Sequence, residues 1–317
     1  MGRFVFFGGK GGVGKTTVSS AYAHKCARAG QTVLLVSTDP AHSTADVFGQ
    51  YFDDDPTPVR GYDTLSVMEI DPEAAVDDHL MDVKRSLGDQ VSPGIVNEID
   101  HQIELAHRTP GAHEAALFDR FIEVMDDAAA YDRVVFDTSP TGGTLRLLSL
   151  PEYLGGWIDR LLEKRRESLD LYERAAIGDR EPRRTRVGDP IIARLRERKE
   201  KFAFAGDTLR TDATFFLVMN PDRLSLRETA RTVDRLDEYD LDVSGLVVNR
   251  LTPEPDPDED GRGARYLRDT VETERARLEE TRESFEPPVV ATIEARAREV
   301  DGDLLESVAA EIDVEPP

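Results

Sequence analysis

The chain has 317 residues, of which 39% are hydrophobic, enough to bury a core in one large domain or two smaller ones. Acidic residues outnumber basic residues by 63 to 40, which gives a net charge of −23 and leaves no evident basic face for nucleic acid or an anionic membrane. No run approaches the roughly 18 consecutive apolar residues of a membrane span, and the N-terminus enters an apolar run without a basic leader. We therefore expect a soluble, cytoplasmic protein that neither binds nucleic acid nor inserts directly into a membrane.

The net charge bears on the salt concentration in which the protein works, and the cysteine content limits the disulfides and metal sites that it can form. Such an acidic surface suits the high-salt cytoplasm of a halophilic cell, where screening shortens the repulsion between carboxylates. An ordinary acidic protein is the alternative. Cys26 is the single cysteine, so the chain can form no internal disulfide, and this residue alone supplies neither a zinc site nor an iron–sulfur cluster.

Apolar runs alternate with helical patterns along the chain, which predicts an α/β fold with a doubly wound, mostly parallel sheet. Strands are expected near 3–8, 32–38, 64–70, 132–137, 213–219, 243–249 and 288–292. Helices are expected over 15–29, 72–88, 112–129, 223–239, 263–284 and 301–312. We interpret residues 1–317 as a single domain, with a helical subdomain formed by two strand-free insertions at about 72–130 and 150–210.

Apolar side chains recur at helical spacing within this expected subdomain. The three stripes are Val76, Leu80, Val83 and Leu87; Leu154, Ile158, Leu161 and Leu169; and Ile191, Leu195 and Phe202. A stripe of this kind indicates a helix packed on the core, and a groove that binds a partner is the alternative.

A phosphate-loop pattern lies between the first expected strand and the first expected helix. Residues 8–17 read GGKGGVGKTT, and Gly9 to Thr16 satisfy G-x-x-x-x-G-K-[ST]. Backbone N–H groups of such a loop bind phosphate oxygens, Lys15 can reach the β and γ phosphates, and Thr16 can ligate Mg²⁺. A glycine-rich hairpin that matches by chance is the alternative. The expected nucleotide-binding residues are Gly9, Lys10, Gly11, Gly12, Val13, Gly14, Lys15, Thr16 and Thr17.

Two carboxylates follow expected strands at the sheet edge where the phosphate loop lies. Asp39 comes directly after 32–38 and can orient a water molecule for attack near the γ-phosphate. Asp137 ends 132–137 and can hold Mg²⁺ through water. The alternatives are an Asp-Pro turn at Asp39 that merely ends its strand and a helix-capping role for Asp137. We predict a magnesium site formed by Thr16, Asp39 and Asp137.

Four histidines fall in the expected helical insertion, at His79, His101, His107 and His113. Their spacing does not place them on one helical face, and no pattern of cysteines or acids completes a ligand set. We therefore expect surface histidines there rather than a metal site. For His24 and His42 we expect either a structural role or a role in supporting residues of the site.

Three segments together resemble the arsenical-pump and guided-entry ATPase family, whose guided-entry members target tail-anchored membrane proteins. They are GKGGVGKTT with its early lysine Lys10, STDPAHS followed by DVFG, and DTSPTGGTLRLLSLPEYL. The early lysine marks the deviant class of phosphate loops, and the resemblance runs over most of the chain. It implies ATP and Mg²⁺ as cofactors, ATP hydrolysis, and a homodimer in which Lys10 reaches the partner's nucleotide. It also implies that Asp39 positions water in switch I, that Asp137 belongs to switch II, and that Lys10, Lys15 and Asp39 are catalytic.

The resemblance extends to two segments near the end of the chain. Val247-Val248-Asn249 resembles the adenine-reading strand, where the Asn249 amide pairs with the base edge. An asparagine that only ends a strand is the alternative. Glu294-Ala295-Arg296 resembles the last nucleotide-contacting loop, which implies that Glu294 and Arg296 contact the nucleotide.

The chain also departs from parts of that family. Arsenite-stimulated members bind the metalloid with several cysteines, and the eukaryotic targeting members join their protomers through a CxxC zinc site, so Cys26 alone supports neither. We expect a chaperone or targeting factor for hydrophobic clients such as tail-anchored membrane proteins. The expected partner of the homodimer is a hydrophobic client protein or a membrane-associated receptor. The alternatives are the energising subunit of an arsenite or anion export pump and a partner-binding regulatory switch of the partitioning type.

Overall fold

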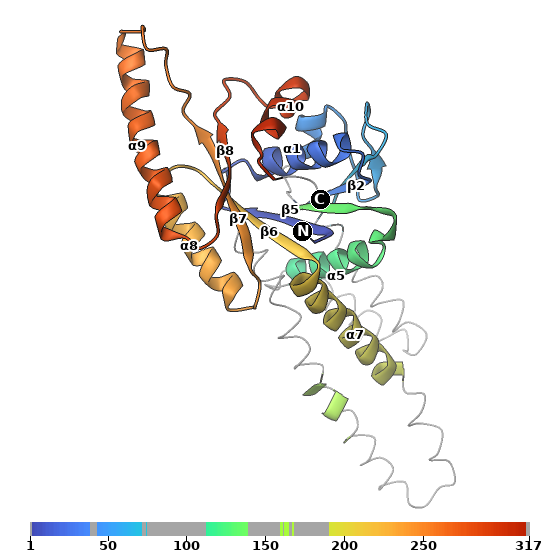
Figure 1. Ribbon diagram of the computed structural model, residues 1–317. Coiled ribbons are helices and arrows are strands. Elements are labelled where there is room, and N and C mark those ends of the chain that lie inside the picture. The colour runs from blue at the N-terminus through green and yellow to red at the C-terminus, as the bar shows by residue number, and fades with distance from the viewer. Residues whose placement is uncertain are drawn as a thin grey trace, which may run out of the picture.

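An eight-stranded sheet forms the centre of the computed structural model, which describes residues 2–38, 43–71, 112–138 and 190–314, with residues 74, 159–160, 162–164 and 167 (Figure 1). The strand order is β3-β4-β2-β5-β1-β6-β7-β8. All neighbouring strands are parallel except β3 and β4. The strands are β1 (Phe4–Gly9), β2 (Val33–Ser37), β3 (Thr57–Pro58), β4 (Leu65–Glu69), β5 (Arg133–Asp137), β6 (Ala213–Met219), β7 (Val243–Leu251) and β8 (Val289–Glu294). The predicted doubly wound α/β fold is confirmed.

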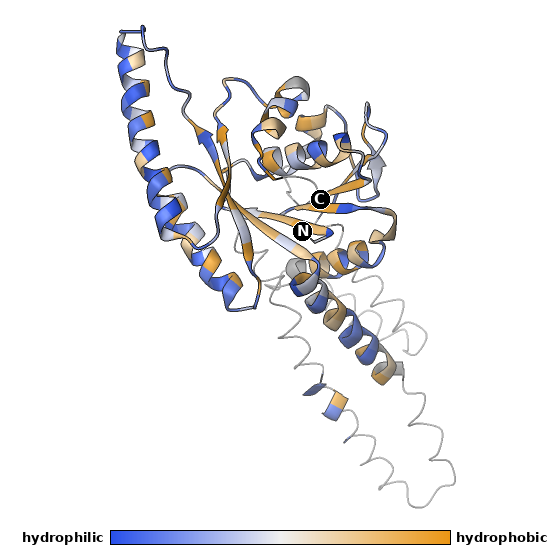
Figure 2. Cartoon of the chain, viewed as in Figure 1, coloured by the Kyte–Doolittle hydropathy of each residue, from blue (hydrophilic) through white to orange (hydrophobic). Residues whose placement is uncertain are grey.

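Helices cover both faces of this sheet (Figure 1). They are α1 (Lys15–Arg28), α2 (Ser43–Phe48), α5 (Ala112–Asp126), the 3-10 helix η1 (Ala128–Ala130), α7 (Pro190–Thr211), α8 (Arg223–Asp237), α9 (Arg262–Ser284) and α10 (Gly302–Glu311). Apolar residues concentrate in the strands, whereas α8 and α9 carry mostly hydrophilic residues (Figure 2). The helices predicted over 15–29, 223–239, 263–284 and 301–312 are confirmed with small shifts of their ends.

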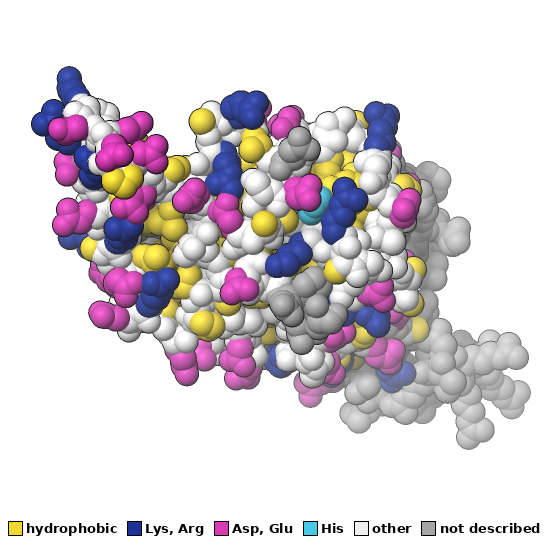
Figure 3. Space-filling model, turned by 45° about the horizontal axis from the view of Figure 1, so that its top comes forward, with side chains coloured by type: hydrophobic (Ala, Val, Ile, Leu, Met, Phe, Trp, Pro, Cys, Tyr) yellow, Lys and Arg dark blue, Asp and Glu magenta, His cyan; other side chains and the backbone are white. Residues whose placement is uncertain are grey.

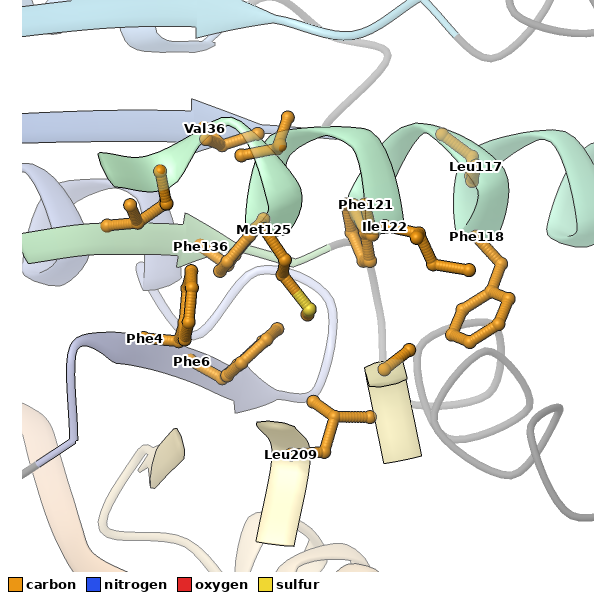
Figure 4. Close-up of a cluster of buried hydrophobic side chains, with 14 of the residues drawn as sticks. Phe4, Phe6, Val36, Leu117, Phe118, Phe121, Ile122, Met125, Phe136 and Leu209 are labelled. Carbon is orange, nitrogen blue, oxygen red and sulfur yellow. The ribbon is translucent and has the colours of Figure 1, made fainter. Parts of the chain in front are cut away.

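Alternation along β1 divides the core into two layers. Phe4 and Phe6 belong to the layer beneath α5 and α7, and Val5 and Phe7 belong to the layer beneath α1 and α10. In the first layer Phe6 stacks on Phe136 of β5, with ring centroids 4.5 Å apart (Figure 4). Successive strand residues point to opposite faces, so this continuous apolar run is what a parallel strand covered on both sides requires.

Two expectations about the helical region fall on described residues. The helix predicted over 112–129 is present but divides into α5 and η1. On α7, Phe202 is 2% exposed and its ring lies 5.6 Å from that of Phe118, so this stripe packs on the core. The helix predicted over 72–88 and the two earlier stripes lie outside the described residues, apart from residue 74.

Strand β3 is the one described strand that the sequence did not predict. It comprises only Thr57 and Pro58, and it pairs antiparallel with Val67 and Ser66 of β4 at the edge of the sheet. Proline lacks a backbone N–H and is tolerated on an edge strand, and two residues are too few to show an alternating pattern.

Candidate nucleotide site

The phosphate loop connects the end of β1 to the start of α1 and depends on glycine at two positions. Gly9 has φ +145°, and a Cβ there would lie 2.3 Å from the Val218 carbonyl oxygen of β6. Gly14 has φ +89°, and its Cβ would lie 2.3 Å from the Asn249 side-chain nitrogen. A side chain at either position would be strained and would collide with a neighbouring strand, so the loop requires glycine there. The first turn of α1, which includes Thr17, adds the backbone N–H groups that a helix N-terminus directs toward an anion.

Lys15 and Thr16 lie where the loop enters α1. The Lys15 side chain is 8% exposed, and its Nζ donates a hydrogen bond to the Lys10 carbonyl oxygen at 3.2 Å. Lys15 therefore lies along the loop, while Gly11 and Gly12 are exposed and Val13 is buried in the core. A buried lysine beside exposed glycines places a positive charge where phosphate oxygens can reach it.

Asp137 meets the phosphate loop across the sheet edge. Thr16 Oγ1 donates a hydrogen bond to Asp137 Oδ2 at 2.6 Å, although the two residues are 121 positions apart. The aspartate is 1% exposed and stands in register with Phe7 of β1 and Ser37 of β2. A hydroxyl and a carboxylate are the oxygen ligands that Mg²⁺ prefers, so the chemistry of this pair fits a magnesium ion. The sequence predicted this juxtaposition from the ends of two strands.

Asp39, the predicted water-positioning residue, lies outside the described residues, as does His42. Thr38, which directly precedes Asp39, is described. Its backbone N–H donates to the Asp137 carbonyl oxygen at 3.1 Å. The chain thus leaves β2 immediately beside Asp137, which is where parallel strands of this order bring their carboxyl ends together.

Lys10 directly follows β1 at the start of the phosphate loop, and its side chain is 35% exposed. Its Nζ is 3.8 Å from Glu228 Oε2 on α8. The sequence did not indicate Glu228, because an acidic residue on an exposed helix is common in a chain with this charge.

Asn249 braces the phosphate loop. Its Nδ2 donates to the Val13 carbonyl oxygen at 2.8 Å, and its Oδ1 accepts from the Arg250 N–H at 2.9 Å. The side chain is 6% exposed, and β7 continues to Leu251, so Asn249 does not end its strand. The alternative of a strand-ending asparagine is therefore wrong, and the described contacts connect its amide to the loop rather than leave it facing solvent.

Glu294 and Arg296 are organised by α10. The Glu294 N–H donates to Glu311 Oε2 at 2.8 Å, and the Arg296 guanidinium forms an ion pair with Glu311 and donates to the Glu294 carbonyl oxygen at 3.0 Å. Glu311 was not predicted from the sequence. The structure thus brings Asn249 to the phosphate loop. The described contacts of Arg296 are with Glu294 and α10, and Glu294 contacts α10 and pairs with Leu251 of β7.

A cavity of about 510 Å³ lies beside this segment, between α9 and the ends of β7 and β8. Four carboxylates line it, from Glu254, Glu274, Glu294 and Glu311, against one cation, Arg275, which pairs with Glu254. Negative side chains repel phosphate oxygens, so a triphosphate belongs at the glycine loop and not in this cavity.

The remaining candidate residues have structural surroundings. His24 is buried, and its Nδ1 lies 2.6 Å from the Tyr62 hydroxyl oxygen. Burial, followed by the nearby Arg28 charge, lowers the pKa of His24 below its ordinary value. This agrees with the structural role expected for His24. Of the four histidines considered for a metal site, only His113 lies on a described element, α5, and its side chain is not described.

Charged side chains of both signs are interspersed on the face shown in Figure 3. Within the described ranges, no three His, Cys, Asp or Glu side chains meet in a way that could hold a metal ion. The described helices also include none that combines the length and apolar character of a bilayer span.

The site combines a glycine loop after β1, a buried lysine and a half-buried threonine at the start of α1, and an aspartate from the adjacent parallel strand. These features define a phosphate-loop nucleoside triphosphatase. The chain matches the family model described as anion-transporting ATPase over residues 2–313. It belongs to this family, whose members are ATP hydrolases, and the resemblance stated from the motifs is confirmed.

Individual relatives cover most of the chain. A protein of Aquifex aeolicus, whose name proposes arsenical pump-driving ATPase 2, is 32% identical over 284 residues, 89% of each chain. The ATPase ASNA1 homolog 1 of Paramecium tetraurelia is 32% identical over 254 residues, which cover 78% of this chain and 75% of the relative. The ATPase GET3 of Phaeosphaeria nodorum is 34% identical over 253 residues, which cover 78% and 76%.

Proposed function

We propose that this protein is a Mg²⁺-dependent ATPase whose homodimer closes on ATP and acts as a chaperone or targeting factor for hydrophobic client proteins such as tail-anchored membrane proteins. The observation that carries the catalytic part is the Thr16–Asp137 contact beside the glycine loop. Relatives named GET3 and ASNA1, at 32–34% identity, support the targeting part.

Each residue of the site has a defined task in this proposal. The loop N–H groups and Lys15 bind the β and γ phosphates, and Asp39 orients the attacking water. Thr16, Asp39 and Asp137 would hold Mg²⁺, partly through water. A bound Mg²⁺ would supply positive charge beside the phosphate oxygens. The protein supplies position and electrostatic stabilisation, since phosphoryl transfer needs little else from it.

Lys10 connects hydrolysis to dimerisation. Its side chain follows β1 at the phosphate loop and is 35% exposed, so its ammonium group is accessible to a second copy. Mixed variants test this directly. A dimer of a Lys10→Ala protomer and an Asp39→Asn protomer keeps one complete site if Lys10 acts across the interface, because the Lys10→Ala protomer retains Asp39 and receives the lysine of its partner.

The mixing experiment therefore has two clear outcomes. Each variant alone should be inactive. Mixing equal amounts should restore up to about a quarter of the wild-type activity, because half of the dimers are then mixed and one of their two sites is complete. If Lys10 acts within its own chain, the mixed dimer has no complete site and mixing restores nothing. That result would refute the proposed action of Lys10 across the dimer interface.

The client is tested by trapping the ATP state. Asp39→Asn protein loaded with ATP and Mg²⁺ should retain clients, and they should be enriched in membrane proteins with a single span. A lone soluble partner would favour a regulatory switch of the partitioning type instead.

An energising subunit of an anion export pump is the second candidate. The family description and the name of the Aquifex relative favour it. Against it, Cys26 is fully buried, and burial raises the pKa of its thiol, so this residue does not offer the thiolate that binds a metalloid. Stimulation of ATP turnover by arsenite would support the pump, and its absence would leave the targeting function.

We also infer that the protein works in a high-salt cytoplasm. The net charge of −23 supports this inference, because salt screens repulsion among the surface carboxylates. The melting temperature should rise as KCl increases from low to molar concentration, and a flat dependence would contradict the inference.

A further inference from the structure

Lys10 is paired within its own chain by a residue that the mechanism above does not use. Lys10 Nζ lies 3.8 Å from Glu228 Oε2, and the two side chains are 35% and 33% exposed. The lysine directly follows β1, and the glutamate lies in the second turn of α8. The pair therefore joins the start of the phosphate loop to a helix that begins more than 200 residues later.

The helix that carries Glu228 is fixed relative to the loop. Strand β6, which precedes α8, pairs directly with β1. Asp222 then caps α8, because its Oδ1 accepts hydrogen bonds from the N–H groups of Leu224 and Ser225, both at 2.9 Å. Glu228 is thus held at a set position beside Lys10 by the sheet and the cap.

Lys10 is also held through its backbone. Its carbonyl oxygen accepts the hydrogen bond from Lys15 Nζ at 3.2 Å. A triphosphate at the loop attracts the Lys15 ammonium group, which then gives up the Lys10 carbonyl. Nucleotide binding therefore releases the backbone of Lys10, and Glu228 remains as its side-chain restraint.

We propose that Glu228 is a positioning residue that retains Lys10 within its own chain until the partner's triphosphate competes for the same ammonium group. This inference rests on the proposed function, in which Lys10 crosses the dimer interface. A triphosphate carries several negative charges, whereas Glu228 carries one. The Lys10 ammonium group therefore leaves Glu228 and binds the partner's triphosphate once the two protomers meet. Glu228 thereby opposes dimerisation of protomers that hold no triphosphate.

The test is the substitution Glu228→Gln, which removes the charge and keeps the shape. We expect the protein concentration at half-maximal specific ATPase activity to fall by about 2- to 30-fold, because closure breaks one exposed ion pair in each protomer. The difference from wild type should shrink in molar salt, where exposed charges are screened. The matched control is Glu238→Gln, which removes one charge just beyond the other end of α8 and should leave this concentration unchanged.

A second measurement needs no dimer. In dilute protein without nucleotide, acetic anhydride should modify Lys10 faster in Glu228→Gln than in wild type, with Lys201 on α7 as the internal reference. The inference is overturned if Glu228→Gln leaves the reactivity of Lys10 unchanged. It is also overturned if the specific activity of wild type depends on protein concentration and Glu228→Gln has the same half-maximal concentration. Either result leaves the proposed function intact. A wild type whose specific activity is independent of protein concentration overturns both.

Discussion

Replacing Asn249 with alanine should weaken nucleotide binding without a loss of base recognition. The substitution removes the 2.8 Å hydrogen bond to the Val13 carbonyl oxygen, which lies in a buried part of the phosphate loop. Leaving a buried carbonyl without this partner costs about 1–3 kcal/mol. If this whole cost falls on the loop conformation that binds ATP and none of it on the free protein, the ATP dissociation constant rises by about 5- to 150-fold.

The assay compares two ligands by titration calorimetry, ATP and inorganic tripolyphosphate, which has no base. If Asn249 acts by bracing the loop, the substitution weakens both ligands by the same factor. If Asn249 reads adenine, ATP loses affinity and tripolyphosphate does not. The second pattern would refute the bracing role and support the role implied by the family resemblance.

Gly14 offers an independent check of the same contact. A Cβ at Gly14 would lie 2.3 Å from Asn249 Nδ2, so Gly14→Ala should also weaken both ligands. Adding Asn249→Ala relieves the collision but not the strain of a positive φ at residue 14, so the double variant should lose less affinity than the product of the two single effects. A double variant whose loss equals that product would contradict the collision as a cause.

Three further predictions concern the metal pair, the core and a buried histidine. Thr16→Ala should raise the Mg²⁺ concentration needed for ATP hydrolysis. Thr16→Ser should keep that concentration near the wild-type value, because serine retains the hydroxyl that donates to Asp137. Equal effects of the two variants would contradict a role for Thr16 as a metal ligand. Phe202→Ala should lower the free energy of unfolding by about 3–5 kcal/mol in urea denaturation, because the ring is buried. The control Phe204→Ala, at a side chain 40% exposed, should lower it by less than about 1.5 kcal/mol. Similar losses in the two variants would contradict the packing of α7. The folded protein lowers the pKa of His24, so the unfolded chain binds a proton more readily. The stability contributed by neutral His24 is therefore present above about pH 6.5 and is lost as the pH falls below it. Wild type should lose free energy of unfolding more steeply than His24→Gln between about pH 7 and 5, and parallel curves would contradict this.

The sequence predicted the parts of the site that local patterns encode. The glycine loop requires a strand before it and a helix after it, and both can be read within twenty residues. Asp137 was predictable because it ends an apolar run, and the carboxyl ends of parallel strands share one edge of the sheet. The order of the strands followed from neither pattern, yet it is this order that places Asp137 2.6 Å from Thr16.

Contacts between distant side chains could not be predicted in the same way. Asn249 and Val13 are 236 residues apart, and only the register of β7 beside β6 brings them together. Glu228 and Glu311 are two of 63 acidic residues, and no periodic pattern separates them from glutamates that face only water. Such residues become visible when the backbone has fixed their neighbours.

The position of β1 in the sheet has a consequence for synthesis of the chain. β1 is flanked by β5 and β6, so its two hydrogen-bonding partners are residues 133–137 and 213–219, and its sequence neighbour β2 is not one of them. Contacts of such long sequence separation form late, since loop closure must precede them. A ribosome must therefore translate beyond residue 219 before the phosphate-loop strand is flanked on both sides, and a nascent chain stalled earlier should not retain ATP.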